Sequence, residues 1–130
     1  PFNNRNLTSM ITQDIIRELY GTPGNLVILV DELSGSSSEE FAGGMQAIGR
    51  ATIIGQQTPG KVLTMEVVPL PERALFVYPN AQTLTAGNEV LEGVGVIPDI
   101  EVGLDKEALL KGKDNQLEKA VEYLMNKPIK

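Results

Sequence analysis

The residues of this chain best suited to catalysis are Ser36 and Lys61, because the sequence contains no histidine and no cysteine. A serine hydroxyl becomes a good nucleophile only when a neighbouring base takes its proton. With histidine absent, lysine is the next base to consider, and burial away from water would favour its neutral, proton-accepting form. The two residues therefore predict nucleophilic catalysis by a Ser–Lys dyad.

Both residues follow apolar runs that are typical of strands. Residues 26–30 precede the polar turn around Ser36, and residues 51–55 precede the breaker cluster at 58–60 and then Lys61. A strand, a tight turn and a helix in that order expose a nucleophile at the start of the helix. If the two strands are neighbours in one sheet, we expect their turns to meet at one edge.

Each residue also has a simpler interpretation. Four serines in the five positions before Glu39 are typical of a flexible turn and a helix N-cap. A lysine after Pro-Gly is commonly a solvated residue at the start of a strand. Taken separately, these structural interpretations are the more common ones.

Two blocks of the sequence resemble the tail-specific, or C-terminal processing, serine proteases of family S41. The family signature runs Ser-Ala-Ser-Glu, Gly-Arg-Ala, Val-Gly and Thr-Phe-Gly-Lys. This chain has Ser-Ser-Ser-Glu at 36–39, Gly-Arg-Ala at 49–51, Ile-Gly at 54–55 and Thr-Pro-Gly-Lys at 58–61. The second block, residues 93–102, is similar to the Gly-Val-x-Pro-Asp motif that closes the family's catalytic domain.

The resemblance implies a role for each matching residue. It makes Ser36 the nucleophile and Lys61 the general base. The Ser37 N–H, at the positive end of a helix, is then expected to stabilise the oxyanion of a tetrahedral intermediate. Glu39 is either an orienting residue of the catalytic site or a first-turn acid favoured by the helix dipole. Asp99 is expected to have a structural role in a turn.

Some positions depart from the protease pattern and keep alternatives open. Gly35 and Ser37 stand where the family usually has alanine, and Pro59 replaces its phenylalanine. Residues 39–55 are also similar to interphotoreceptor retinoid-binding protein modules, which share the fold and bind apolar ligands without cleaving peptides. Those modules generally lack the lysine, so Lys61 favours the protease. A purely structural domain with a degenerate dyad is a third alternative.

One family motif has no counterpart here. The Asp-Leu-Arg-x-Asn-x-Gly-Gly strand and turn, which supplies one oxyanion amide, is not matched in residues 1–25. We therefore expect residues 1–130 to form a single domain, the C-terminal portion of an S41-type catalytic domain, and to be nearly inactive alone. The uncovered sheet edge would favour self-association, or an N-terminal segment rearranged to cover that edge. The resemblance further implies protein or peptide substrates presented by their C-terminal ends, and an extracytoplasmic setting.

Composition argues against several other functions. A net charge of −6 without a Lys/Arg cluster argues against nucleic-acid binding. The absence of cysteine excludes disulfides and zinc–thiolate sites, and no spacing of acidic residues resembles a calcium loop. We expect neither a metal nor a cofactor.

Hydrophobic periodicity predicts an α/β fold in which strands and helices alternate at first and strands then dominate. The run at 26–30 is continuous, so we expect that strand to be buried on both faces. The resemblance implies a ClpP/crotonase-like ββα superhelix. The expected helices lie at 7–20, 38–48, 106–111 and after a cap at Asp114, and the expected strands at 26–30, 51–55, 61–67, 74–78 and 82–85.

Overall fold

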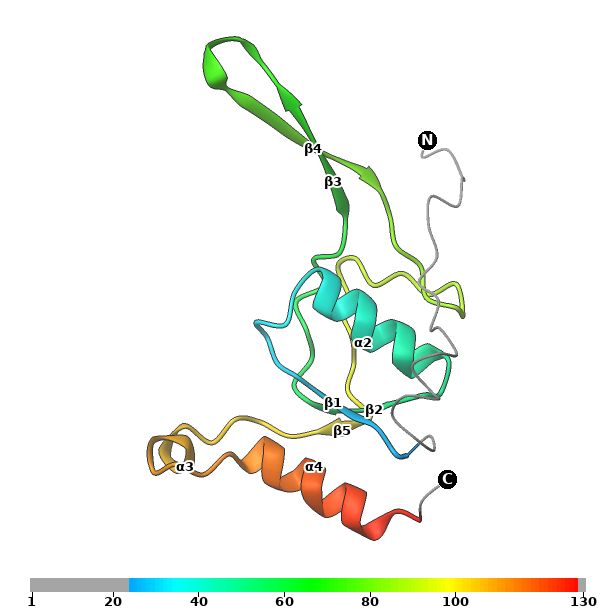
Figure 1. The fold of residues 1–130 in the computed structure, drawn as a ribbon, viewed down its shortest axis with the longest axis vertical. Coiled ribbons are helices and arrows are strands. Elements are labelled where there is room, and N and C mark those ends of the chain that lie inside the picture. The colour runs from blue at the N-terminus through cyan, green and yellow to red at the C-terminus, as the bar shows by residue number, and fades with distance from the viewer. Residues whose placement is uncertain (1–23, 129–130) are drawn as a thin grey trace.

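The computed structural model describes residues 24–128. Its centre is a parallel sheet in the order β1 (Val27–Val30), β2 (Thr52–Gly55) and β5 (Ile100–Glu101). Helix α2 (Ser37–Ala47) lies over one face of this sheet and α4 (Asn115–Asn126) over the other, as Figure 1 shows. These layers confirm the predicted α/β class. No helix in the described part of the chain is long and apolar enough to cross a bilayer.

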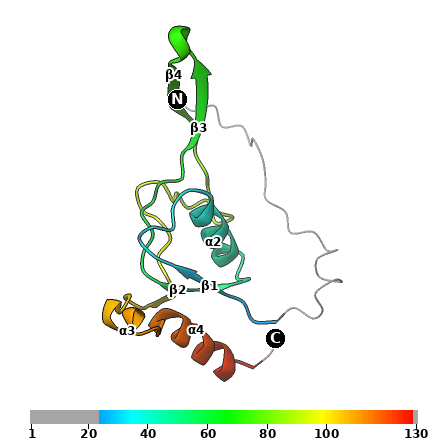
Figure 2. The ribbon, with the colours of Figure 1, turned by 60° about the vertical axis from the view of Figure 1, so that its left-hand side comes forward.

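A separate antiparallel hairpin extends away from the sheet (Figures 1 and 2). It consists of β3 (Thr64–Pro69) and β4 (Leu75–Ala81), joined through a short 3₁₀ turn at Pro71–Arg73. Most of its side chains are exposed on both strands. The hairpin thus stands apart from the core that positions the candidate site.

Most expected elements are confirmed, with four differences. Strand β3 begins three residues later than predicted, β4 runs on to Ala81, and residues 82–85 contribute only a bridge between Leu84 and Val90. The two-residue strand β5 was not predicted. The expected helices at 38–48, at 106–111, which is α3 (Lys106–Leu110), and after Asp114 are present. The helix expected at 7–20 lies outside the described residues.

The expectation that the first strand is buried on both faces is wrong. Val30 is 4% exposed, but Leu29, on the opposite face, is 38% exposed. The reason is the position of β1, which is an edge strand of the sheet formed by residues 24–128. Helix α4 covers its face only in part.

The hydrophobic core lies between α2 and the sheet. Gly43 in α2 allows close packing there, because a Cβ at this position would come within 3.0 Å of Leu91 Cδ1 and 3.2 Å of Val96 Cγ2. This contact confirms the packing role expected for a glycine inside the helix. Each fully buried aliphatic side chain contributes about 1.5–3 kcal/mol. The core residues are Val30, Ala42, Ile53, Val62, Leu91 and Val96.

Candidate active site

The fold brings the turns that carry Ser36 and Lys61 together. Strands β1 and β2 are parallel and end side by side, with Val30 opposite Gly55. The turns that follow leave the same edge of the sheet, and the Ser36 N–H donates to the Lys61 carbonyl oxygen at 3.1 Å. The predicted meeting of the two turns is therefore confirmed for their backbones. Within residues 24–128, the Ser36 hydroxyl and the Lys61 amine do not hydrogen-bond to each other.

The environment of Lys61 within the described residues does not meet the condition that the dyad sets. Its side chain is exposed, and so is that of Ser36. A lysine acts as a base in its neutral form, which burial favours. The described residues cover the backbone of Lys61 but not its amine, so they do not provide the burial that this chemistry requires.

Ser36 has a strained backbone conformation at the start of α2. Its φ of 58° and ψ of −127° lie where residues with a Cβ are rarely found, and such strain costs about 1–3 kcal/mol. The Ser36 N–H has two acceptors, the Lys61 carbonyl and Glu39 Oε2 at 3.0 Å, which hold the turn in place. Strained backbone of this kind concentrates at functional sites, and a sharp strand-to-helix turn exposes a nucleophilic serine.

The backbone amide of Ser37 occupies the first turn of α2. No acceptor in residues 24–128 takes its hydrogen, whereas the Ser38 and Glu39 N–H groups donate to Gly35 and Ser36 carbonyls. The positive end of the helix dipole lies at this position. The Ser37 N–H is thus available to an anionic ligand, as an oxyanion donor must be.

Glu39 joins the two turns through hydrogen bonds to their backbones. Its side chain is fully buried, and its carboxylate accepts four hydrogen bonds. Oε2 accepts from the Ser36 N–H at 3.0 Å and the Lys61 N–H at 2.8 Å, and Oε1 accepts from the Gly60 N–H at 2.6 Å and the Thr58 hydroxyl at 2.5 Å. Glu39 is a first-turn acid of α2, and its contacts in the described chain are with the backbone of Lys61 and not with its amine.

These hydrogen bonds determine the ionisation of Glu39. Burial alone would raise the pKa of its carboxyl group. The hydrogen bonds from Thr58, Lys61, Gly60 and Ser36 lower it by more, so the pKa of Glu39 lies below the ordinary value. The buried carboxylate is therefore ionised near neutral pH.

Thr58 connects this carboxylate to the second sequence block. The Thr58 hydroxyl donates to Glu39 and accepts from the Val96 N–H at 2.7 Å. Two glycines allow the segments to approach. Gly60 and Gly95 both have positive φ, and a Cβ on either would lie within 2.7 Å of the backbone of the other segment.

A second carboxylate binds the backbone just after Lys61. Glu92 Oε2 accepts from the Val62 N–H at 2.8 Å and the Leu63 N–H at 3.1 Å. Residues 60–63 belong to no strand, so these four consecutive N–H groups are bound by two carboxylates instead of a sheet. This arrangement explains why β3 begins at Thr64 and not at Lys61.

Asp99 has structural contacts, as expected. Its Oδ2 accepts from the Ile53 N–H at 2.7 Å, and its own N–H donates to the Ile53 carbonyl at 2.9 Å. The Gln46 amide donates to Asp99 Oδ1 and also to the Ile97 carbonyl. The residue thereby fixes the second sequence block to β2 and to α2.

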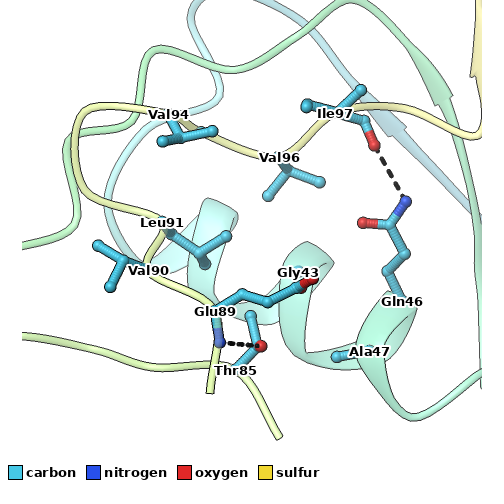
Figure 3. Close-up of a pocket in the computed structure, with 11 residues that line it drawn as sticks. Gly43, Gln46, Ala47, Thr85, Glu89, Val90, Leu91, Val94, Val96 and Ile97 are labelled. Atoms are coloured by element: carbon cyan, nitrogen blue, oxygen red, sulfur yellow. Dashed lines mark hydrogen bonds between the residues drawn. The ribbon is translucent and has the colours of Figure 1, made fainter. Parts of the chain in front are cut away.

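A pocket of about 390 Å³ with a mixed polar and apolar lining lies away from these residues, beside the C-terminal half of α2. Figure 3 shows Gly43 and Ala47 of the helix on one side and Val94, Val96 and Ile97 on the other. Neither Ser36 nor Lys61 lines it. The pocket is thus a feature distinct from the candidate catalytic residues.

Sequence reasoning identified four of the residues at this site and missed two. Ser36, Ser37, Glu39 and Lys61 lie on the two turns whose backbones meet, as predicted, while within residues 24–128 no hydrogen bond joins the Ser36 hydroxyl to the Lys61 amine. The importance of Thr58 and Glu92 was missed, although Thr58 lies in the breaker cluster and Glu92 directly precedes the second block.

Comparison with known proteins identifies relatives of this arrangement. The profile of peptidase family S41 matches residues 2–102. A carboxy-terminal-processing protease of Bartonella bacilliformis is 35% identical over 89 residues, covering 68% of this chain and 20% of that protein. A chloroplastic C-terminal processing peptidase of Tetradesmus obliquus is 34% identical over 101 residues, covering 72% of this chain and 21% of that protein. The chain thus spans about a fifth of the length of these relatives.

Solved structures agree with the fold. The photosystem II D1 C-terminal processing protease matches with a TM-score of 0.57 and 32% identity, covering 61% of this chain and 20% of that chain. The tricorn protease matches with a TM-score of 0.70 over 77% of this chain and 10% of that chain. At 24% identity, the second likeness concerns the fold alone.

Proposed function

This chain belongs to peptidase family S41, and we propose that it carries the nucleophile and the general base of a serine endopeptidase. In this proposal Lys61 removes the proton of the Ser36 hydroxyl, and Ser36 Oγ attacks the carbonyl carbon of the scissile peptide bond. The oxyanion that forms accepts a hydrogen bond from the Ser37 N–H. Collapse of the tetrahedral intermediate expels the amine, which takes up the proton held by Lys61, and water then hydrolyses the acyl-enzyme.

The single observation that carries this proposal is the hydrogen-bonded junction of the two turns. The strained Ser36 and the backbone of Lys61 are joined directly at 3.1 Å and again through the carboxylate of Glu39. A surface serine and a surface lysine without a common function require no such connection. The proposal also requires that further groups cover the amine of Lys61, which residues 24–128 leave exposed.

Substitution in the complete protein tests the dyad. Ser36→Ala and Lys61→Ala should each abolish cleavage of an unfolded protein substrate while leaving the fold intact. Their double variant should be scarcely slower than either single one, because the pair acts as a unit. Ser38→Ala and Lys113→Ala, at exposed positions, are controls that should retain activity. Near-normal cleavage by Lys61→Ala would make that lysine a surface residue and end the proposal.

Substrate class and location extend this proposal. The names of the relatives describe processing at the carboxy terminus, and we propose that this chain's substrates are proteins or peptides presented by their C-terminal ends. The resemblance to tail-specific proteases is the support for a setting outside the cytoplasm. Protease-protection of the complete protein in intact cells would test the location, and peptides with free or amidated C-termini would test the substrate.

The pocket beside α2 suggests one other candidate function, binding of a small ligand with an apolar part. Its volume of about 390 Å³ falls in the range of small-molecule sites, and valine, leucine and isoleucine side chains form much of its lining. An apolar fluorescent probe such as anilinonaphthalene sulfonate should bind there, and Val94→Asp should weaken binding. Lys61→Ala should leave it unchanged. Binding that persists in Val94→Asp would remove this candidate.

A further inference from the structure

The position of Lys61 depends on its backbone. Its side chain is exposed, and its amine makes no hydrogen bond or ion pair within residues 24–128. The segment from Gly60 to Leu63 belongs to no strand, so a sheet does not hold it. Buried or half-buried backbone N–H groups nevertheless need acceptors. The acceptors of these backbone N–H groups therefore fix the position from which the Lys61 side chain extends.

Two carboxylates share this task on either side of the lysine. Glu39 accepts from the Gly60 and Lys61 N–H groups, and Glu92 accepts from the next two, those of Val62 and Leu63. Glu39 also binds the nucleophile's turn, whereas the two contacts of Glu92 are on the lysine's own segment. The roles of the two acids therefore differ.

Glu92 is itself firmly held. Leu91 before it belongs to the core and is 7% exposed, and Gly93 after it donates its N–H to the Gly60 carbonyl at 2.8 Å. The turn that carries Glu92 thus packs on one side against α2 and hydrogen-bonds on the other to the segment preceding Lys61. Its carboxylate offers a fixed acceptor to the segment that follows.

We propose that Glu92 is a positioning residue for the general base: it fixes the backbone of residues 62–63 and thereby aims Lys61 at Ser36. This inference rests on the proposed Ser–Lys function. Glu92 touches neither Ser36 nor the Lys61 amine by hydrogen bond in the described chain, so it acts through the lysine's backbone. Misplacement of a catalytic group by about 1 Å can cost about 100-fold in rate.

The geometry separates the acceptor role of Glu92 from its charge. Both hydrogen bonds go to the same atom, Oε2. Glu92→Gln keeps one oxygen at that distance and can retain both bonds. Glu92→Asp keeps the charge but is shorter by one methylene, about 1.5 Å, and cannot reach both N–H groups without moving the segment. Glu92→Ala offers no acceptor at all.

The test is steady-state cleavage by these variants in the complete protein, with a matched structural control. Asp114→Ala also deletes a carboxylate that accepts two consecutive N–H groups through one oxygen, but at the start of α4. We expect Glu92→Ala to lower kcat about 100-fold with little change in KM, and Glu92→Asp to lower it in the same direction. Glu92→Gln should remain within about threefold of the parent, and Asp114→Ala should keep its kcat while losing stability.

The split between kcat and KM, together with rescue by Glu92→Gln, is a readout that loss of stability alone does not move. Asp114→Ala should lose stability while its kcat and KM stay those of the parent.

The outcomes distinguish this inference from the proposed function. If Lys61→Ala retains cleavage, the dyad is wrong and the positioning role falls with it. If Lys61→Ala is inactive but Glu92→Ala has the same kcat as Asp114→Ala, the dyad stands and only the positioning role of Glu92 is overturned. Loss of activity in Glu92→Gln equal to that in Glu92→Ala would also overturn it, since the charge and not the acceptor oxygen would then matter. If Glu92→Ala does not fold, the Gln and Asp variants still decide between these outcomes.

Discussion

Replacing Glu39 with glutamine should destabilise this chain strongly. The carboxylate accepts two hydrogen bonds on each oxygen from a fully buried position. A glutamine side chain has one oxygen, so its NH₂ group must face two of the four donors. Each buried donor left unpaired costs about 1–3 kcal/mol, and Glu39→Gln should therefore lower the free energy of unfolding by about 2–6 kcal/mol.

Equilibrium unfolding in urea, followed by circular dichroism, measures this loss. The matched control is Glu40→Gln, the next residue of the same helical turn, which loses the charge of a half-buried carboxylate that accepts from the Thr83 hydroxyl. The control should change the free energy of unfolding by no more than about 1 kcal/mol. The m-value should stay constant in both variants, which shows that stability and not the compactness of the unfolded state has changed.

Equal stability of the two variants would refute the central role assigned to Glu39. It would mean that the four donors find other acceptors or water without cost. The connection between the turns of Ser36 and Lys61 would then not depend on this carboxylate.

Three further predictions follow from the same contacts. The pKa of Glu39 is lower in the folded chain than its ordinary value. Its contribution to stability is therefore complete above the ordinary carboxyl pKa and disappears as the pH falls through the folded pKa. Unfolding curves should show that the difference in free energy of unfolding between the parent and Glu39→Gln becomes smaller in acid. Thr58→Val should cost about 1–3 kcal/mol in urea unfolding, since the buried Val96 N–H loses its acceptor, and NMR titration should show the pKa of Glu39 rising because the Thr58 hydrogen bond no longer lowers it. The 130-residue chain alone should be nearly inactive in peptide cleavage and should self-associate in light scattering through its sheet edge, whereas robust turnover by a monomer would contradict this.

The arrangement of the site was predictable because its signals are local. The apolar run before Ser36 and the run before the Thr58–Lys61 turn each predict a strand, and both strands are confirmed. Parallel strands with neighbouring ends then place the two turns at one edge. The serine-rich start of α2 indicated a helix N-terminus, and this signal is also local, since cap residues act over three or four positions.

What the sequence did not predict depends on contacts between distant segments. Glu39 lies 19–22 residues from three of its donors, and Glu92 lies 29–30 residues from both of its own. Alternation after Lys61 is compatible with a strand, but the distant Glu39 and Glu92 bind the N–H groups of residues 60–63 and the strand begins at Thr64. Strand β5 has two residues, too few for any period to show.

Burial could not be predicted for a related reason. A Ser–Lys dyad requires burial of Lys61, but the described residues leave its side chain exposed. Burial of a side chain at this edge of the sheet depends on the groups that pack over it. The residues next to Lys61 in the sequence do not indicate whether such groups are present.

Active-site labelling of the complete protein is the most direct test of the Ser36–Lys61 dyad. A fluorophosphonate probe reacts with a serine whose hydroxyl is activated, and mass spectrometry of the digested protein locates the adduct. The dyad predicts an adduct on the peptide that contains Ser36, formed by the parent and by Lys113→Ala but lost in Lys61→Ala. Labelling of another serine, or undiminished labelling of Ser36 in Lys61→Ala, would contradict the assignment of nucleophile and base.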